Sequence, residues 1–485
     1  MNQGEKKQSV TVNYIYNMAY QLIVLILPLI TTPYVSRVLG PDGVGMYGLT
    51  YSISQYFVLF GCIGLNLYGQ REIAYHQNQR DERSKVFFEL LMIRTAAMLL
   101  SISVFVFTVC RDDKYGLLYR IETLELIAAL IDITWFFQGL EDFKKIVIRN
   151  CVVKLGGVAL IFLFVRTSSD TPVYTLILSM TVLLGNFSMW LYLPRYLQRV
   201  PVSSLNIAKH IYPALMLFIP QIATSVYNVL DKSMIGMITG IDAEVAYYEQ
   251  AQKIIKMALS VPLALGTVML PRMASMYGEG NHEGIKGYIR RSMRFVCMLS
   301  FPLCTGVVGI SKDFVPWFFG PGFDKVIGNL LVISPVIVLV GVSNVIGVQY
   351  LLPTNRQNDY TKSVVIGTGV NFICNMLLIP GFLSVGAAVG SVIAEFSVTL
   401  VQLFIVRKEF SMKAVVQDIY KYLIGALLML FCIWLYSYLA ASPRLIHTMI
   451  EIMIGVLIYG VFLIAVRDSF VLSFWNKVKK LVKKS

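Results

Sequence analysis

Asp231 and Lys232 place a carboxylate beside an ammonium group near the end of a long apolar stretch. If this stretch is helical, Gln221, Thr224, Asn228 and Asp231 share one face, because they are three or four residues apart. A charge inside a membrane span costs roughly 2.5–3.5 kcal/mol, so such groups usually face a wet cavity or each other. The polar stripe favours a cavity. The alternative is that the dipeptide lies at the lipid headgroups and ends the helix.

Other apolar stretches also carry charge, namely Arg94, Asp132, Lys154, Lys253 and Lys256. Three of them have a simpler interpretation. Arg94 could extend to the inner membrane surface, and Lys253 is four residues from a glutamate that could neutralise it. Asp132 precedes a Trp-Phe-Phe sequence typical of an interfacial aromatic belt, although a belt does not explain the aspartate. A cavity with excess cationic side chains favours an anionic cargo such as phosphate or pyrophosphate.

The usual catalytic and nucleotide-binding signatures are missing from the sequence. It has no Gly-x-x-x-x-Gly-Lys-Ser/Thr phosphate loop and no His-Glu-x-x-His motif, and its four histidines are scattered. The seven cysteines lie in or beside apolar runs without a Cys-x-x-Cys pair, so we interpret them as packing residues. We therefore expect no enzyme activity, no cofactor and no bound metal.

The chain that carries these charges is strongly apolar. Of its 485 residues, 56% are hydrophobic and 14% are charged, and the mean hydropathy is +0.67. This composition predicts an all-α polytopic membrane protein. The net charge of +14 arises from basic residues in short segments between apolar runs. That pattern reflects membrane topology rather than nucleic-acid binding.

Apolar stretches of roughly 18–25 residues, long enough for a helix to cross a bilayer, occur about fourteen times. The predicted spans are residues 12–36, 44–67, 86–110, 117–139, 146–165, 172–193, 211–239, 248–271, 292–311, 326–352, 362–380, 383–406, 421–440 and 447–466.

The loops between these spans indicate the topology. An even number of spans places both termini on one side, and the N-terminus, alternate loops and the tail hold most of the basic residues. Both termini are therefore predicted to be cytoplasmic. The loops are short, which disfavours a membrane polymerase or glycosyltransferase, because such an enzyme usually needs a sizeable domain outside the membrane.

A faint internal repeat predicts how the spans are grouped. Gly-Pro-Asp at 40–42 is followed by Tyr47, and Gly-Ile-Asp at 240–242 is followed by Tyr247, with identical spacing and an offset of 200 residues. Such duplication is typical of secondary transporters. The predicted parts are an N-terminal lobe of six spans (1–194), a cytoplasmic linker (195–210), a second lobe of six spans (211–406), a terminal pair of spans (407–466) and a basic cytoplasmic tail (467–485).

Several separate motifs resemble those of the Wzx-type polysaccharide flippases. Residues 131–141, Ile-Asp-Ile-Thr-Trp-Phe-Phe-Gln-Gly-Leu-Glu, are similar to the family's Asp-x-x-Trp-Phe-Phe-Gln-Gly-x-Glu stretch. The further matching segments are Phe-Ile-Pro-Gln (218–221) with Tyr227 and Asp-Lys (231–232), Tyr-Glu-Gln-Ala-Gln-Lys (248–253), Val-Met-Leu-Pro-Arg (268–272), Phe-Gly-Pro-Gly-Phe (319–323) and Leu-Pro-Thr (352–354). The resemblance covers nearly the whole chain.

This resemblance implies a member of the polysaccharide transporter family in the MOP (MATE-like) exporter superfamily. It implies two pseudo-symmetric lobes around a central cavity, with fourteen helices being common. The implied activity is translocation of undecaprenyl-diphosphate-linked repeat units for capsule, exopolysaccharide or O-antigen across the bacterial cytoplasmic membrane. The resemblance implies cavity roles for Asp132, Asp231, Lys232, Lys253 and Arg272, and charge alone adds Lys154, Lys256 and Arg94.

The expected mechanism is alternating access, in which cavity cations bind the diphosphate while the lipid tail stays in the bilayer. Asp231 or Asp132 is a candidate carrier of a coupling H⁺ or Na⁺. The expected partners are a lipid-diphosphate-linked oligosaccharide, membrane lipids, and the polysaccharide polymerase and chain-length machinery. The alternatives are a MATE-like drug/cation antiporter, which should have an acid-dominated cavity, and a flippase for the peptidoglycan lipid precursor.

Overall fold

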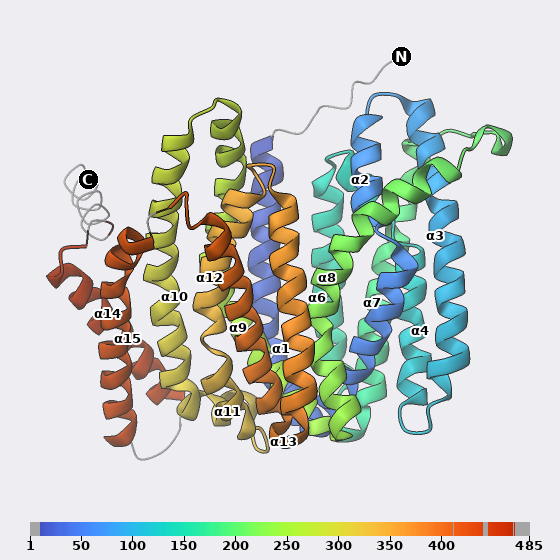
Figure 1. Ribbon diagram of the computed structural model, residues 1–485. Coiled ribbons are helices and arrows are strands. Elements are labelled where there is room, and N and C mark those ends of the chain that lie inside the picture. Colours follow the sequence, from blue (N-terminus) through green and yellow to red (C-terminus); the bar gives the residue numbers. More distant parts are fainter. Residues whose placement is uncertain (1–9, 411, 440–444, 469, 471–485) are drawn as a thin grey trace, which may run out of the picture. The chain divides into compact units, whose positions relative to one another are not determined.

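The computed structural model describes residues 10–410, 412–439, 445–468 and 470, and over these residues it contains helices without β-strands (Figure 1). The predicted all-α fold is therefore confirmed. The chain divides into two compact units. One comprises residues up to 236 together with 241–246, and the other comprises residues 237–240 and those from 247 onward. Within the described part, nine helical stretches are long and apolar enough to cross a membrane.

The first unit contains long helices that run roughly parallel to one another and short ones at their ends (Figure 1). Its α-helices are α1 (Val10–Cys62), α2 (Leu65–Tyr75), α3 (Arg80–Thr108), α4 (Gly116–Leu130), α5 (Thr134–Gly139), α6 (Phe143–Phe164), α7 (Thr171–Trp190) and most of α8 (Ala208–Thr239). Its short 3₁₀-helices are η1 (Val109–Arg111), η2 (Ser168–Asp170), η3 (Leu193–Arg195) and η4 (Val202–Ser204).

The second unit is also built from long helices. They are α9 (Asp242–Gly278), whose first turn packs with the first unit, α10 (His282–Phe319), α11 (Lys325–Ile333), α12 (Val336–Ile346), the π-helical turn η5 (Gly347–Leu351), α13 (Gln357–Val406), α14 (Met412–Leu439) and α15 (Leu445–Ala465). The predicted basic tail lies almost wholly outside the described residues. The predicted lobe boundaries stay a prediction.

Every predicted span overlaps a helix, but three predicted spans are interrupted. The second span breaks between α1 and α2, where Ile63 and Gly64 both have positive φ. The fourth span breaks between α4 and α5, where Asp132 Oδ1 accepts a hydrogen bond from the Thr134 backbone N–H at 2.9 Å. This local contact from a side chain to the backbone two residues on is typical of a turn, and it lies between the two helices. The tenth span breaks before Pro335, which has no backbone N–H with which to continue the hydrogen bonding of α11.

Two glycines with similar backbone angles connect consecutive spans. Gly40 has φ 68° between the halves of α1, and Gly240 has φ 65° between α8 and α9. Glycine adopts this left-handed conformation without the steric cost of a Cβ atom. The two segments that share a sequence pattern thus also share a glycine with positive φ. The repeat itself stays a prediction.

The Trp-Phe-Phe sequence of α5 forms part of a core in the first unit. Trp135, Phe136 and Phe137 are each at most 2% exposed and pack with residues of α2 and α3. A Cβ atom at Gly69 of α2 would lie 2.5 Å from Trp135 Cε3, so α2 and α5 approach closely because this residue is glycine. The interpretation of these rings as an interfacial belt is wrong, because they are buried inside the unit.

Candidate functional site

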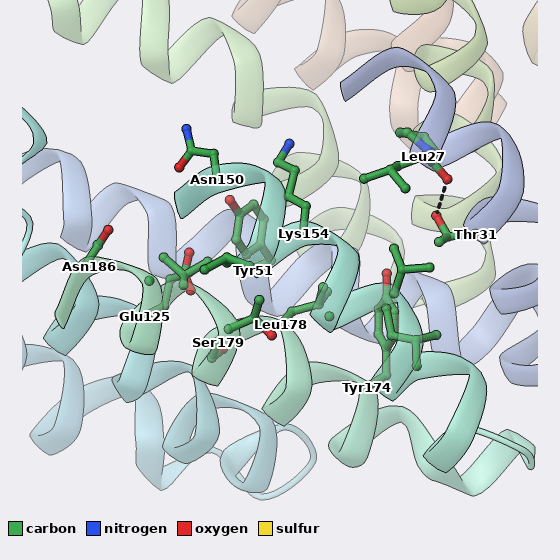
Figure 2. A pocket seen from close by; sticks show the side chains of 18 of the residues that line it. Leu27, Thr31, Tyr51, Glu125, Asn150, Lys154, Tyr174, Leu178, Ser179 and Asn186 are labelled. Carbon is green, nitrogen blue, oxygen red and sulfur yellow. Dashed lines mark hydrogen bonds between the residues drawn. The ribbon is translucent and has the colours of Figure 1, made fainter. Parts of the chain in front are cut away.

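A cavity of about 360 Å³ lies within the first unit, between α1, α4, α6 and α7 (Figure 2). Its wall combines apolar side chains with basic, acidic, hydroxyl and amide groups. The polar wall residues are Thr31, Tyr47, Tyr51, Glu125, Arg149, Asn150, Lys154, Tyr174, Ser179, Thr181 and Asn186. Since α1, α6 and α7 belong to stretches able to cross a membrane, this polar cavity is a candidate site inside the bilayer.

Helix α6 supplies the basic part of the wall. Asn150 and Lys154 are one turn apart, and Figure 2 shows their side chains pointing in the same direction. Arg149 Nη1 donates to Thr134 Oγ1 and to Asn186 Oδ1, both at 3.1 Å. These bonds hold the guanidinium in the wall. Lys154 is half-buried and lines this cavity. Its role in binding a cargo stays a prediction.

Helices α1, α4 and α7 supply aromatic and acidic groups. The Tyr47 ring stacks on Tyr51 at 5.5 Å and meets Tyr174 edge-on at 5.0 Å, both measured between ring centroids. Glu125 of α4 is half-buried in the same wall. Packed rings are stiff, whereas hydroxyl and carboxyl groups can exchange hydrogen bonds with a polar ligand. The cavity therefore offers cationic groups together with sites for hydrogen bonding.

Lys232 contacts the same wall from α8. Its Nζ atom lies 5.8 Å from the centroid of the Tyr51 ring, which is within the range of a cation–π interaction. Asp231 is 3% exposed. The alternative that this dipeptide ends its helix at the headgroups is wrong, because α8 continues to Thr239 and the carboxylate is buried.

The rest of the predicted polar stripe on α8 is only partly described. Gln221 is half-buried, whereas the side chains of Thr224 and Asn228 lie outside the described residues. The continuous stripe thus stays a prediction.

Arg94 and Asp132 are brought together away from the cavity wall. Arg94 is 1% exposed, and its Nη2 lies 3.8 Å from Asp132 Oδ2. Its Nε donates to Ala129 O at 2.8 Å, and its Nη1 donates to Asn66 Oδ1 at 2.7 Å. Arg94 therefore does not extend to the membrane surface. We interpret it as the residue that joins the end of α4 to the start of α2.

The three predicted residues of α9 lie in the second unit and are separate from this cavity. Lys253 forms the ion pair with Glu249 that their spacing suggested, with 2.9 Å between Nζ and Oε1. Lys256 is exposed. Arg272 is also exposed, and its guanidinium lies 4.5 Å from the centroid of the Tyr288 ring. Their roles in transport stay predictions.

Other wall residues were not predicted as site residues from the sequence. Glu125 of α4 lines the cavity, whereas Asp132 lies beyond the end of α4 and does not. Asn150 and Asn186 are short amides in apolar helices. Their spacing within α6 and α7 carries a signal only once these two helices are known to be neighbours. Among the described residues, no three His, Cys, Asp or Glu side chains are grouped to hold a metal ion.

Two known protein families match this chain. The family described as "Polysaccharide biosynthesis protein" matches residues 10–277, which is more than half of the chain and includes the whole cavity. The chain belongs to this family. A second family, described as "Lipid II flippase MurJ", matches residues 151–456. Among curated relatives of this family member, the "Putative O-antigen transporter" of Escherichia coli (strain K12) is 24% identical over 406 residues, covering 83% of this chain and 97% of that protein.

Two solved structures share the fold of this polysaccharide biosynthesis family member. Lipid II flippase MurJ in an inward closed conformation has a TM-score of 0.75 at 15% identity, covering 94% of this chain and 99% of that one. An inward-facing MATE family multidrug resistance transporter of the MOP superfamily has a TM-score of 0.64 at 14% identity, covering 83% and 99%. The MATE/MOP-like fold and the resemblance to Wzx-type flippases are therefore confirmed.

Proposed function

We propose that this protein is a flippase that moves lipid-diphosphate-linked oligosaccharide units across the bacterial cytoplasmic membrane. The observation that carries the proposal is the polar cavity of the first unit, in which Lys154 and Arg149 lie among membrane-spanning helices. The family assignment and the O-antigen transporter relative support a transporter of lipid-linked glycans rather than an enzyme.

The wall chemistry fits both parts of such a headgroup. A diphosphate is anionic, and ammonium and guanidinium groups are its strongest side-chain hydrogen-bond donors. Arg149 is held in place by Thr134 and Asn186, so it can bind without first being ordered. Sugar hydroxyls both donate and accept hydrogen bonds, which matches Asn150 and the tyrosines. Lys154 is the residue that we assign to the diphosphate.

The transport cycle that we propose is alternating access, with the lipid tail in the bilayer throughout. Asp231 and Asp132 are candidates for binding a coupling H⁺ or Na⁺. Both termini are proposed to be cytoplasmic, and a polysaccharide polymerase and its chain-length machinery are proposed to act on the exported units.

The test is a flipping assay in proteoliposomes with a fluorescent lipid-diphosphate oligosaccharide. We expect Lys154→Ala to lower the initial rate at least about tenfold, because a charge-assisted contact worth roughly 1.5–3 kcal/mol is removed. Lys154→Arg should retain most of the rate. The control is Lys144→Ala, which removes an exposed ammonium from the start of the same helix. Equal rates for Lys154→Ala and the control would exclude the assigned role.

A second candidate cargo is the peptidoglycan lipid precursor. The match of residues 151–456 to the lipid II flippase family favours it. Both cargoes carry a lipid diphosphate, so Lys154 would serve either. Competition of unlabelled lipid II against the fluorescent oligosaccharide lipid distinguishes them. A flippase for longer repeat units should be inhibited only weakly.

A further inference from the structure

Glu451 is a buried acid that the proposed transport site does not use. It lies two turns into α15, its side chain is 0% exposed, and neither carboxyl oxygen has a hydrogen-bond partner among the described residues. It also lines a groove of about 520 Å³ within the second unit, where the other described wall residues are apolar apart from Tyr459. An ionised carboxylate without donors is strongly disfavoured in such surroundings.

A second carboxyl group faces Glu451 from another helix. Asp313 of α10 is 5% exposed. Its carboxyl group and the Ser437 hydroxyl of α14 lie within hydrogen-bonding reach of the Glu451 carboxyl group. The Ser437 hydroxyl already donates to Asp313 Oδ2 at 2.7 Å. The Ser437 proton is thus committed to Asp313. Two facing carboxyl groups can form a hydrogen bond only if one of them carries a proton.

The other titratable groups on the packed helices have contacts of their own or are exposed. On α15, His447 is one turn before Glu451, and its Nδ1 is hydrogen-bonded to the Tyr436 hydroxyl of α14 at 2.9 Å. On the other side, the Tyr459 hydroxyl donates to Met298 O at 2.8 Å. Lys312 of α10 is exposed. α9 contributes the apolar Val261 to the groove.

The position of the pair along its helices suggests where a proton would enter. Asp313 lies six residues before the end of α10, and Glu451 lies six residues after the start of α15. With cytoplasmic termini, the segment between α14 and α15 is extracytoplasmic. The pair would then lie closer to the outer surface, and His447 and Tyr436 would lie between it and that surface.

We propose that Glu451 and Asp313 form a proton-binding site within α10, α14 and α15, and that this site couples transport to a proton taken up from the extracytoplasmic side. The coupling rests on the proposed transport function, whereas proton binding by the pair does not. Because the Ser437 hydroxyl donates to Asp313 and Glu451 has no donor of its own, the pair holds one proton when the site is loaded. Loss of that proton leaves a buried charge that the apolar groove cannot accommodate, so the helices must rearrange or expose the site.

Proton binding is tested on the purified full-length protein in lipid nanodiscs by infrared spectroscopy. We expect a protonated-carboxyl band at neutral pH in the unmodified protein, and a loss of part of this band in Glu451→Gln. Asp313→Asn should also lower it, because the amide donates a hydrogen bond that favours the ionised Glu451. The control is Glu283→Gln, which removes an exposed carboxyl near the start of α10 and should leave the band unchanged.

Two spectroscopic results would overturn the site. One is a neutral-pH spectrum of Glu451→Gln that equals that of the unmodified protein, with both melting at the same temperature. The other is disappearance of the band when Na⁺ is added at constant pH, which would show a cation site in place of a proton site.

Coupling is tested separately in proteoliposomes with an imposed pH gradient. We expect the gradient to stimulate flipping by the unmodified protein and by Glu283→Gln, and the ratio of rates with and without the gradient to fall toward one in Glu451→Gln. No stimulation in the unmodified protein would overturn coupling. A protein that fails to flip under any condition would contradict the proposed function, and the infrared result would still decide proton binding.

Discussion

At the scale of single residues, Arg94 shows where sequence reasoning stops. Its charge predicts a special environment in the third span, but charge alone does not distinguish a surface-directed, a cavity-lining and a structural arginine. The structure shows a fully buried guanidinium with partners on α4, on α2 and between α4 and α5. These partners come from three parts of the chain. No local pattern contains that information.

Replacing Arg94 should therefore affect stability more than substrate specificity. We expect Arg94→Ala to destabilise the protein by roughly 2–4 kcal/mol, because Asn66 and Ala129 lose a buried donor and Asp132 loses its counter-charge. Arg94→Lys should rescue little, since one ammonium group cannot reproduce the divergent donors of a guanidinium. Thermal unfolding in detergent measures this, with the exposed Arg71→Ala as control. An unchanged melting temperature in Arg94→Ala would contradict the structural role.

Asp468 should make stability depend on acid pH. It is 0% exposed, and burial alone would raise its pKa, but the Lys421 ammonium, the Tyr422 hydroxyl and the Phe470 backbone N–H hold the pKa below its usual range. Since the folded pKa is lowered, this cluster adds stability above the ordinary Asp pKa of about 3.9 and loses it as the pH falls through the folded value.

The corresponding variant is Asp468→Asn. At neutral pH we expect it to cost roughly 3 kcal/mol, because a buried ion cluster loses its anion. The difference from the unmodified protein should shrink as the pH falls below about 4. Melting curves from neutral to acid pH measure both effects. A pH-independent difference would show that packing, rather than charge, is responsible.

At the scale of elements, hydropathy predicts the helices well and their interruptions poorly. Each predicted span overlaps a helix, because an apolar stretch of sufficient length has few other ways to satisfy its backbone in a bilayer. The breaks at Asp132 and before Pro335 depend on a local side-chain-to-backbone contact and on a missing backbone donor, within stretches that remain apolar overall. A window average does not detect such single-residue effects.

Substitution by alanine is expected to have opposite effects on stability at two glycines. A Cβ atom at Gly45 of α1 would lie 1.7 Å from the carbonyl oxygen of Asp242 at the start of α9, whereas one at Gly156 of α6 would meet nothing within 4 Å. We expect Gly45→Ala to destabilise by about 1–3 kcal/mol through overpacking. Gly156→Ala should be neutral or stabilise by up to about 1 kcal/mol. Thermal unfolding of both variants compares them, and equal effects would contradict the close approach.

At the scale of the whole molecule, the sequence predicts the class and the fold but not the cavity. Composition and span number predict a polytopic membrane protein, and separate motifs predict the family, because both are local properties of the chain. The cavity depends on which helices are neighbours. Lys154 and Glu125 belong to different predicted spans, and only the packing of α4 and α6 on α1 and α7 places them in one wall.

The predicted orientation in the membrane is testable with single cysteines. We expect Ser204→Cys, in the exposed segment before α8, to react with a membrane-impermeant maleimide only after permeabilisation of the inner membrane. Asp113→Cys, in the exposed segment before α4, should react in spheroplasts that are still sealed. The unmodified protein is the control, because its seven cysteines are all buried or half-buried. The reverse labelling pattern would place the termini outside.

The two glycine turns also have an evolutionary consequence under the predicted duplication. Two copies of one ancestral segment are identical at first, so later differences between them indicate that the copies acquired different structural roles. Asp42 after the first turn is exposed, whereas Asp242 after the second is held by Lys114 Nζ at 2.8 Å and by the Tyr115 hydroxyl at 2.6 Å. One descendant has retained a free surface carboxylate, and the other has become an anchor for α9. Loss of the carboxylate should therefore be tolerated at Asp42 but not at Asp242.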